Sequence, residues 1–458
     1  MANEATTPGS PRLLHLSHPI RSLTIAFGLW KALIFLVVLG CPGPGYDTST
    51  GLLPYLSSGT GDVISRDTKH APIVALLKFT RWDSIYFVHI AERGYVFEQE
   101  WAFGYGYTRI LAFLASFFHP SNGVGEAAVI TAVGIAVSHI SHYLSVLALY
   151  RLSVNVFGQH SRARELLCFL TPILHIISPA GAFLSAPYGE SLFAMLNIGG
   201  FYLYSSAFLD ARARKGASSH AKLLLAAGLF AVASTVRSNG VLSGILFAYD
   251  ALVYAWAIVS RGPSKEACLR LAVTIVGGCI VGLGFVLPQV IAYLSYCTAG
   301  ETLRPWCQRL IPSIYGWVQE QYWNVGFLRY WTLSNLPLFL LALPMLVLLC
   351  WSSIWACKGD ISLGSPASTA AHSSTMASLL IRLALPQGIL AVLAFTSYHV
   401  QIVNRISSGY PLWYWYIAYQ ILSGFESKHS RALPVAVTSM VMYGLVQATL
   451  FGSFLPPA

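Results

Sequence analysis

Charged side chains are scarce in this sequence of 458 residues, where they make up 10% of the chain against about 25% in ordinary soluble domains. Hydrophobic residues make up 55%, and the mean hydropathy is +0.60. A soluble enzyme of this length needs a wetted surface that 28 basic and 18 acidic side chains cannot cover, whereas a surface that faces lipid needs no charge. The composition therefore indicates a multi-pass membrane protein and excludes a disordered chain.

Several motifs of known chemistry are also missing from the sequence. It has no CxxC pair for zinc, no Walker loop, no GxGxxG, no GxSxG and no Asn-x-Ser/Thr glycosylation sequon. Eight cysteines are too few for a disulfide scaffold, and the net charge of +10 comes without the basic run that would indicate nucleic-acid binding. The sequence therefore gives no support for nucleotide, serine-hydrolase or zinc chemistry, and we expect no metal and no cofactor.

Eleven windows are long and apolar enough to be read as membrane spans, each of which needs about 20 residues. A further piece, Ile110 to Phe118, is too short to span and is expected to be a re-entrant or interfacial helix. The eleven expected spans are Leu23–Gly40, Ala127–Tyr150, Leu166–Leu184, Ser191–Leu209, Leu223–Val236, Val241–Ser260, Leu271–Tyr296, Thr332–Ala356, Met376–Thr396, Ser407–Ser423 and Pro434–Phe451. Because two of these windows are short or interrupted by proline, 10 or 11 spans are expected.

The distribution of Lys and Arg over the loops sets the expected orientation, because cytosolic loops retain positive charge. Residues 1–22 are expected to be a cytosolic tail, and residues 23–458 a single transmembrane domain. The loops at about 41–126 and 297–331 then lie on the other side, where basic and acidic residues nearly balance. Every polar and aromatic cluster falls on that same face. Apart from Lys31, Arg382 and the histidines, the expected spans are nearly free of ionisable groups, which argues against a transporter.

The first non-cytosolic loop carries Asp83, in the run Arg81-Trp82-Asp83-Ser84-Ile85-Tyr86-Phe87. On a helix that starts near Arg81, Asp83 would lie beside aromatic side chains three and four residues later. A partly desolvated carboxylate is a stronger base and suits proton abstraction. The alternative is that Asp83 caps the helix or pairs with Arg81 or Arg93.

Three other segments on the same face carry charged candidates. Glu190 begins a span, where it could cap the helix or, with Tyr188, hydrogen-bond sugar hydroxyls. Arg237 and Arg405 stand at the membrane boundary, where Arg suits a lipid-linked phosphate through its bidentate fork, although a snorkelling role among lipid headgroups is the alternative.

Two cysteines, Cys297 and Cys307, lie ten residues apart in one loop and could form a small disulfide if that loop is in an oxidising compartment. His139 and His142 are three residues apart within a span. Interhelical hydrogen bonding is the favoured interpretation of this pair over metal binding. The dense aromatics at Tyr322–Trp331 and Tyr410–Trp415 are explained mainly as interfacial belts.

Taken in order, these segments resemble one family, the PIG-V-like mannosyltransferases that add the second mannose to glycosylphosphatidylinositol (GPI) precursors. The resemblance covers about Leu23 to Phe451, and its specificity comes from the order of the motifs. One departure is Gly189, where a hydroxyl residue is expected. The motifs that carry it are Arg81-Trp82-Asp83, Arg93-Gly94-Tyr95, Glu98-Gln99-Glu100-Trp101-Ala102-Phe103, Ser185–Ala194, Arg237-Ser238-Asn239-Gly240, Tyr322–Tyr330 and Pro411–Trp415.

The resemblance implies an all-α GT-C glycosyltransferase fold in the endoplasmic reticulum membrane, with a lumenal active site, and transfer of an α-1,6 mannose from dolichyl phosphate mannose. Asp83 would be the general base of an inverting reaction. Two alternatives are another GT-C enzyme acting on protein or N-glycan precursors, and a lipid transporter; a small accessory membrane subunit is left open. The candidate substrate-binding residues are Arg81, Trp82, Tyr86, Glu98, Glu100, Tyr188, Glu190, Arg237, Asn239, Asn324 and Arg405.

Overall fold

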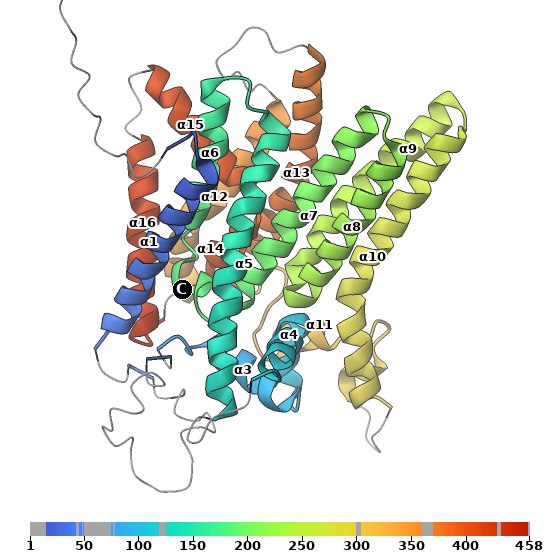
Figure 1. Cartoon of the computed structure of the whole chain (residues 1–458). Coiled ribbons are helices and arrows are strands. Elements are labelled where there is room, and N and C mark those ends of the chain that lie inside the picture. Colours follow the sequence, from blue (N-terminus) through green and yellow to red (C-terminus); the bar gives the residue numbers. More distant parts are fainter. Residues whose placement is uncertain are drawn as a thin grey trace, which may run out of the picture.

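The computed structural model describes residues 15–42, 45–47, 49, 75–76, 78–118, 125–298, 304–359, 370–427 and 432–456. Over these residues the chain is a bundle of helices without a strand (Figure 1). The expected all-α fold is therefore confirmed for the described part of the chain. Residues 1–14 of the expected cytosolic tail and residues 50–74 of the expected first loop lie outside it.

Nine long helical segments in the described residues are apolar enough to cross a membrane. They agree with nine of the eleven expected spans and confirm a multi-pass membrane protein. The segments are built on α1 (Pro19–Gly40), α5 (Glu126–Phe157), α7 (Gly189–Arg212), α8 (Gly216–Val236), α9 (Gly244–Arg261), α10 (Lys265–Tyr296), α12 (Leu336–Lys358), α13 (Ala370–Thr396) and α16 (Ala432–Gly452).

The other two expected spans, Leu166–Leu184 and Ser407–Ser423, are wrong as continuous helices. In the structure α6 (Arg162–Ile176) stops early, and α15 (Leu412–Ser427) starts late. Prolines 179 and 411 explain both breaks, because proline donates no backbone hydrogen bond and disfavours helix in the residue before it. Short 3-10 turns, η5 (Gly181–Leu184) and η10 (Ser407–Gly409), take the place of the missing helix. Irregular backbone thus enters the bundle at two places.

Buried polar side chains form hydrogen bonds with the carbonyl groups of this irregular backbone. Such partners are needed because the interior of a membrane offers no water to bind these groups. The Lys31 ammonium donates to the Leu184 carbonyl at 2.7 Å and to the Ser185 hydroxyl at 2.9 Å. The Asn197 amide donates to the Gly409 carbonyl at 3.0 Å. These contacts fix the segment before α7 and the segment before α15 against neighbouring helices.

A second buried polar group lies within the spans and corrects the expectation that they hold few ionisable residues. Asp250 of α9 accepts from Arg382 Nε of α13 at 2.8 Å and from the Tyr204 hydroxyl of α7 at 2.6 Å. The two charged side chains are 6% and 9% exposed. Asp250 is therefore a further ionisable residue within the spans, and its contacts with Arg382 and Tyr204 join three helices.

The short helices α3 (Asp83–Arg93), α4 (Tyr105–Ala115) and α11 (Ile314–Gln321) gather at one end of the bundle (Figure 1). The expected short helix at Ile110–Phe118 corresponds to α4, which starts and ends earlier. Close approach fixes α4 to the end of α8: a Cβ on Gly104 would lie 1.8 Å from the Val236 carbonyl oxygen. Six further elements complete the described part of the chain: η4 (Glu98–Ala102), η6 (Ser238–Ser243), η7 (Pro305–Gln308), η8 (Leu333–Asn335), η9 (Val400–Ile402) and α14 (Val403–Ile406).

Candidate active site

A cavity of about 910 Å³ opens at the end of the bundle that carries α3, α4 and α11. Its walls come from segments that are far apart in the sequence: the start of α3, η4, the end of α8, α10, α11 and the stretch before α15. Asp83, Arg237 and Arg405 all line it. Three of the predicted charged residues therefore share one cavity.

Asp83 is the first residue of α3, and the turn before it is held from several sides. Trp82 has a φ of 55°, a conformation that a bulky residue adopts only where its surroundings enforce it. The Arg81 carbonyl accepts a hydrogen bond of 2.8 Å from the Tyr188 hydroxyl, while the Arg81 guanidinium lies 4.7 Å from the Phe454 ring centre. This turn presents the Asp83 carboxylate, 40% exposed, to the cavity.

Asp83 contacts Arg405, and Glu190 in turn joins Arg405 to Arg237. The Arg405 Nη2 atom lies 3.0 Å from Asp83 Oδ2 and 2.6 Å from Glu190 Oε1, and Arg405 Nε donates to the same Glu190 oxygen at 2.8 Å. Arg237 Nη1 reaches that oxygen as well, at 2.8 Å. Two carboxylates and two guanidinium groups thus form a connected cluster, called the charge cluster below, whose formal charges cancel.

Glu190 is the buried centre of the charge cluster, with a side chain that is fully shielded from solvent. It occupies the first turn of α7, the position at which a helix favours a negative charge. Glu190 thus has the position at a helix start that the sequence indicated, and it also belongs to the charge cluster. Because the carboxylate is shielded and shared by two arginines, its direct contacts are to Arg237 and Arg405.

Arg405 is contacted by two aromatic rings as well as by two carboxylates. Its guanidinium carbon lies 4.1 Å from the Phe183 ring centre and 5.1 Å from that of Tyr188. Burial alone would lower the pKa of the Arg405 guanidinium, but Glu190 and Asp83 beside it hold that pKa above its ordinary value. Arg405 therefore stays charged and links Asp83 to the interior of the bundle.

Arg237 is less fully engaged than Arg405. It is 15% exposed, and the only ion pair that the described residues give it is the one to Glu190. Its Nε atom is buried and has no hydrogen-bond partner among those residues. Arg237 thus lines the cavity with a guanidinium that, in the described residues, pairs with one carboxylate, whereas Arg405 pairs with two.

The other candidate residues divide between the walls and the support of the site. Trp82 lines the cavity, and Tyr86, 38% exposed, stacks on the cavity residue Phe103 with 4.5 Å between ring centres. The Asn239 amide donates to the Tyr410 hydroxyl at 3.3 Å from a buried position. Asn324 is exposed, with a φ of 51°. Tyr188 is buried, and its hydroxyl is committed to Arg81.

The two glutamates of the first loop hold neighbouring segments together. Glu100 is buried, forms an ion pair with Arg93 and accepts from the backbone N–H groups of Val96 and Phe97 at 2.8 and 3.0 Å. Arg93 is thus paired with Glu100, whereas the sequence allowed a pair with Asp83. Glu98 accepts from the Trp306 indole at 3.0 Å.

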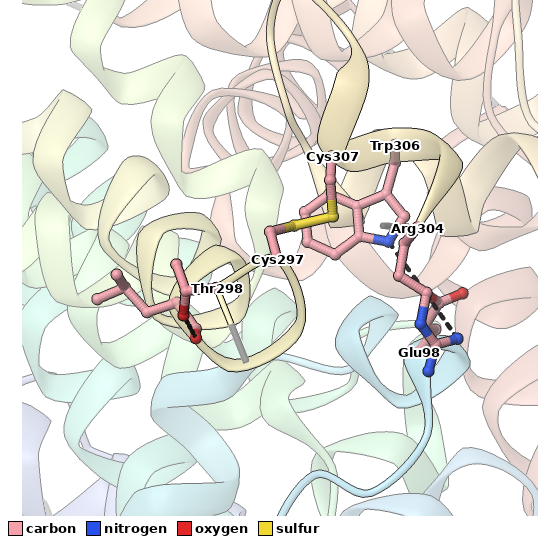
Figure 2. Close-up of a disulfide and its surroundings, with 7 residues drawn as sticks. Glu98, Cys297, Thr298, Arg304, Trp306 and Cys307 are labelled. Atoms are coloured by element: carbon pink, nitrogen blue, oxygen red, sulfur yellow. Dashed lines mark hydrogen bonds and ion pairs between the residues drawn. A yellow bond between two sulfur atoms is a disulfide. The ribbon is translucent and has the colours of Figure 1, made fainter. Parts of the chain in front are cut away.

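Glu98 contacts residues beside a disulfide that joins Cys297 to Cys307, the pairing that their spacing suggested (Figure 2). The Cα atoms of the two cysteines are 5.7 Å apart. Arg304 Nη1 lies 3.2 Å from Glu98 Oε1, on the oxygen that also accepts from Trp306. The disulfide and these two contacts of Glu98 therefore connect the end of α10 to η4, which forms one wall of the cavity.

Sequence reasoning missed several polar residues of the cavity wall. Gln289 of α10 accepts from the Ser313 hydroxyl and from the Tyr315 backbone N–H, both at 3.1 Å, and so sets the start of α11. Gln319 and His399 also line the cavity. The one available signal was Gln289 itself, a polar residue after a proline inside an apolar run.

The histidines of α5 do not belong to the cavity. His142 Nε2 lies 3.3 Å from the His175 carbonyl of α6, and His139 Nδ1 lies 2.8 Å from the Ile135 carbonyl of its own helix. In the described residues no group of three or more His, Cys, Asp or Glu side chains is arranged to hold a metal ion.

The family model described as "Mannosyltransferase (PIG-V)" matches residues 33–458. The chain belongs to this family of mannosyltransferases. The resemblance seen in the motifs is therefore confirmed, the protein is a glycosyltransferase, and the lipid-transporter alternative is set aside.

Curated relatives agree over the whole length. A protein of Aspergillus oryzae named GPI mannosyltransferase 2 is 59% identical over 453 residues, covering 98% of each chain. Its namesake from Aspergillus fumigatus is 54% identical and covers 97% of this chain and 95% of its own. Among solved structures, the oligosaccharyltransferase AglB of Archaeoglobus fulgidus aligns with a TM-score of 0.44 at 12% identity, over 93% of this chain and 56% of the archaeal one.

Proposed function

We propose that this protein transfers the second mannose of the GPI anchor, in an α-1,6 linkage, from dolichyl phosphate mannose to a precursor that already carries one mannose. We place the reaction on the lumenal side of the endoplasmic reticulum membrane and in the GT-C class. The name of the relatives that match end to end supports the acceptor. The observation that carries the proposal is the meeting of Asp83, Arg237 and Arg405 at one cavity from three distant segments.

In this reaction Asp83 accepts the proton of the acceptor 6-hydroxyl while that oxygen attacks the anomeric carbon of the donor. The new bond joins the acceptor oxygen to this carbon, the bond from the carbon to the phosphate oxygen breaks, and dolichyl phosphate leaves. The β-linked donor gives an α-linked product, so the reaction inverts. Asp83 suits this role because it is exposed to the cavity while Arg405 fixes one of its oxygens at 3.0 Å.

The two arginines divide the remaining work between them. Arg405 already directs Nε and Nη2 to carboxylates and acts as a positioning residue for Asp83. Arg237 also lines the cavity, and in the described residues it forms an ion pair with Glu190 alone, so it is the better placed to donate to the departing phosphate. A charge that strengthens its interaction as the phosphate departs stabilises the transition state. Neither step needs a metal or another cofactor, because a lipid phosphate leaves without a nucleotide to clamp.

Expression of the protein in cells that lack this step and accumulate GPI precursor with one mannose tests the proposal. We expect the two-mannose precursor to appear and surface GPI proteins to return. An unchanged one-mannose precursor, with the protein present in the membrane at normal abundance, would contradict it. Mannose transfer to protein or N-glycan precursors in the same cells would favour the alternative acceptor class.

A further inference from the structure

A second cavity, of about 720 Å³, lies between α12, α15 and α16. Its lining extends from Leu341 to Trp351 on α12 and from Ala436 to Tyr443 on α16. At 1.5 Å per residue these stretches are about 15 and 10 Å long. The cavity is therefore elongated along the helix axes, and we call it the lateral groove.

The helices beside the lateral groove present apolar side chains to their surroundings. Trp351 on α12 is 57% exposed, and Val435 and Met442 on α16 are 62% and 55% exposed. In a multi-pass membrane protein such a surface contacts the lipid chains. The groove is thus accessible to a molecule that arrives within the bilayer.

One end of the lateral groove adjoins the active site. Asn404 lines the groove, whereas the next residue, Arg405, lines the active-site cavity. Both residues belong to α14, a helix of a single turn, so this short helix forms the wall between the two spaces. The segment before α7 gives a second junction, since Pro179 lines the groove and Phe183 the cavity. The Asn404 amide donates to the Tyr443 hydroxyl at 3.0 Å at this end.

The chemistry of the two substrates decides which of them fits this arrangement. The donor's polyprenyl tail begins directly beyond the phosphate whose bond to the sugar breaks, so it leaves the reaction centre beside Asp83 and Arg405. The acceptor's lipid is separated from the reacting hydroxyl by several sugar rings. A membrane groove that starts one residue from Arg405 therefore matches the donor.

We propose that the lateral groove binds the first isoprene units of the donor's polyprenyl tail, an assignment that rests on the proposed function. The groove orients the donor lipid so that its phosphate enters the cavity next to Arg405. Recognition of the tail is then physically separate from recognition of the sugar and of the acceptor.

Filling the groove tests this assignment. Ser439 lines the groove and is exposed, so Ser439→Trp adds bulk there without disturbing a buried contact. The matched control is Thr438→Trp, because Thr438 is also exposed on α16 but does not line the groove. Ala436→Phe is a second filling variant, for use if the first does not accumulate.

The assay measures KM in membranes for two donors, the full-length dolichyl phosphate mannose and a short-tailed analogue in which a single methyl group replaces the polyprenyl tail. We expect Ser439→Trp to raise the KM for the full-length donor about tenfold, the effect of excluding about two methylene groups. The KM for the short-tailed donor and for the acceptor should not change, and Thr438→Trp should behave as wild type.

Three outcomes would overturn the assignment: an unchanged KM for the full-length donor, an equal rise for both donors, or a rise in the acceptor KM alone. The last would assign the groove to the acceptor lipid. Failure of the proposed function itself would look different, because the wild-type protein would then produce the two-mannose precursor from neither donor.

Discussion

Replacing Arg405 by Lys separates the positioning of Asp83 from the binding of phosphate. Arg405 contacts Asp83 at 3.0 Å and Glu190 at 2.6 and 2.8 Å through a planar group that is 14% exposed. A Lys ammonium keeps the charge but does not reproduce this fork. At least one charge-assisted hydrogen bond is lost, which costs about 1.5 to 3 kcal/mol. If that loss falls on the transition state, the rate drops about ten- to a hundredfold.

The two arginines should differ in which kinetic constant changes. For Arg405→Lys we expect kcat to fall by this factor while the KM for dolichyl phosphate mannose changes little, because Asp83 loses its orientation. For the matched variant Arg237→Lys we expect mainly a higher donor KM. Mannose transfer is measured in microsomes over a range of donor concentrations, with the abundance of each variant determined in parallel. Full activity of Arg405→Lys at both limiting and saturating donor would refute the positioning role.

Three further predictions concern stability and topology. Glu190→Gln leaves two partly buried guanidinium groups without their shared carboxylate, so we expect the free energy of unfolding to fall by about 3 to 5 kcal/mol, read as lower abundance and a lower Tm. Asp250→Asn should destabilise the protein similarly but leave the activity per folded molecule unchanged, and an equal loss of specific activity in both variants would argue against a site-specific role of Glu190. Cys307→Ser should lower the free energy of unfolding by about 2 to 3 kcal/mol, whereas Cys268→Ser, at an exposed free cysteine, should leave it unchanged. Equal stability of the two variants would show that the disulfide contributes nothing. A sequon made by Leu310→Asn with Pro312→Thr should be glycosylated in cells and one made by Ala217→Asn should not, whereas the reverse pattern would invert the expected topology.

The sequence predicted most of the fold because long apolar windows and charged loops are local signals. It failed at Leu166–Leu184 and Ser407–Ser423, where the windows are apolar enough but prolines 179 and 411 interrupt the helix. Hydropathy does not register such a break, because irregular backbone inside the bundle can be as apolar as a helix. Those two breaks also adjoin the charge cluster, because Glu190 lies in the first turn of α7 and Arg405 lies in the segment before α15.

The charged residues of the site could be predicted one by one, but their connections could not. Asp83, Glu190, Arg237 and Arg405 each stood out as an ionisable group at a membrane boundary. That both arginines share one oxygen of Glu190 depends on how three distant segments meet, which no local pattern encodes. Gln289 was missed for the same reason, since its partners on the way into α11 are more than twenty residues away.

The central claim is that Asp83 is the base that activates the acceptor, and Asp83→Asn tests it most directly. The variant keeps the size of the side chain and a hydrogen bond to Arg405 but cannot take up the proton. The measurement is the rate at which membranes containing normal amounts of the variant elongate the one-mannose GPI precursor. We predict a loss of at least about a hundredfold, the lower end of general-base contributions. Elongation at a near-normal rate would contradict the assignment of Asp83 as the base.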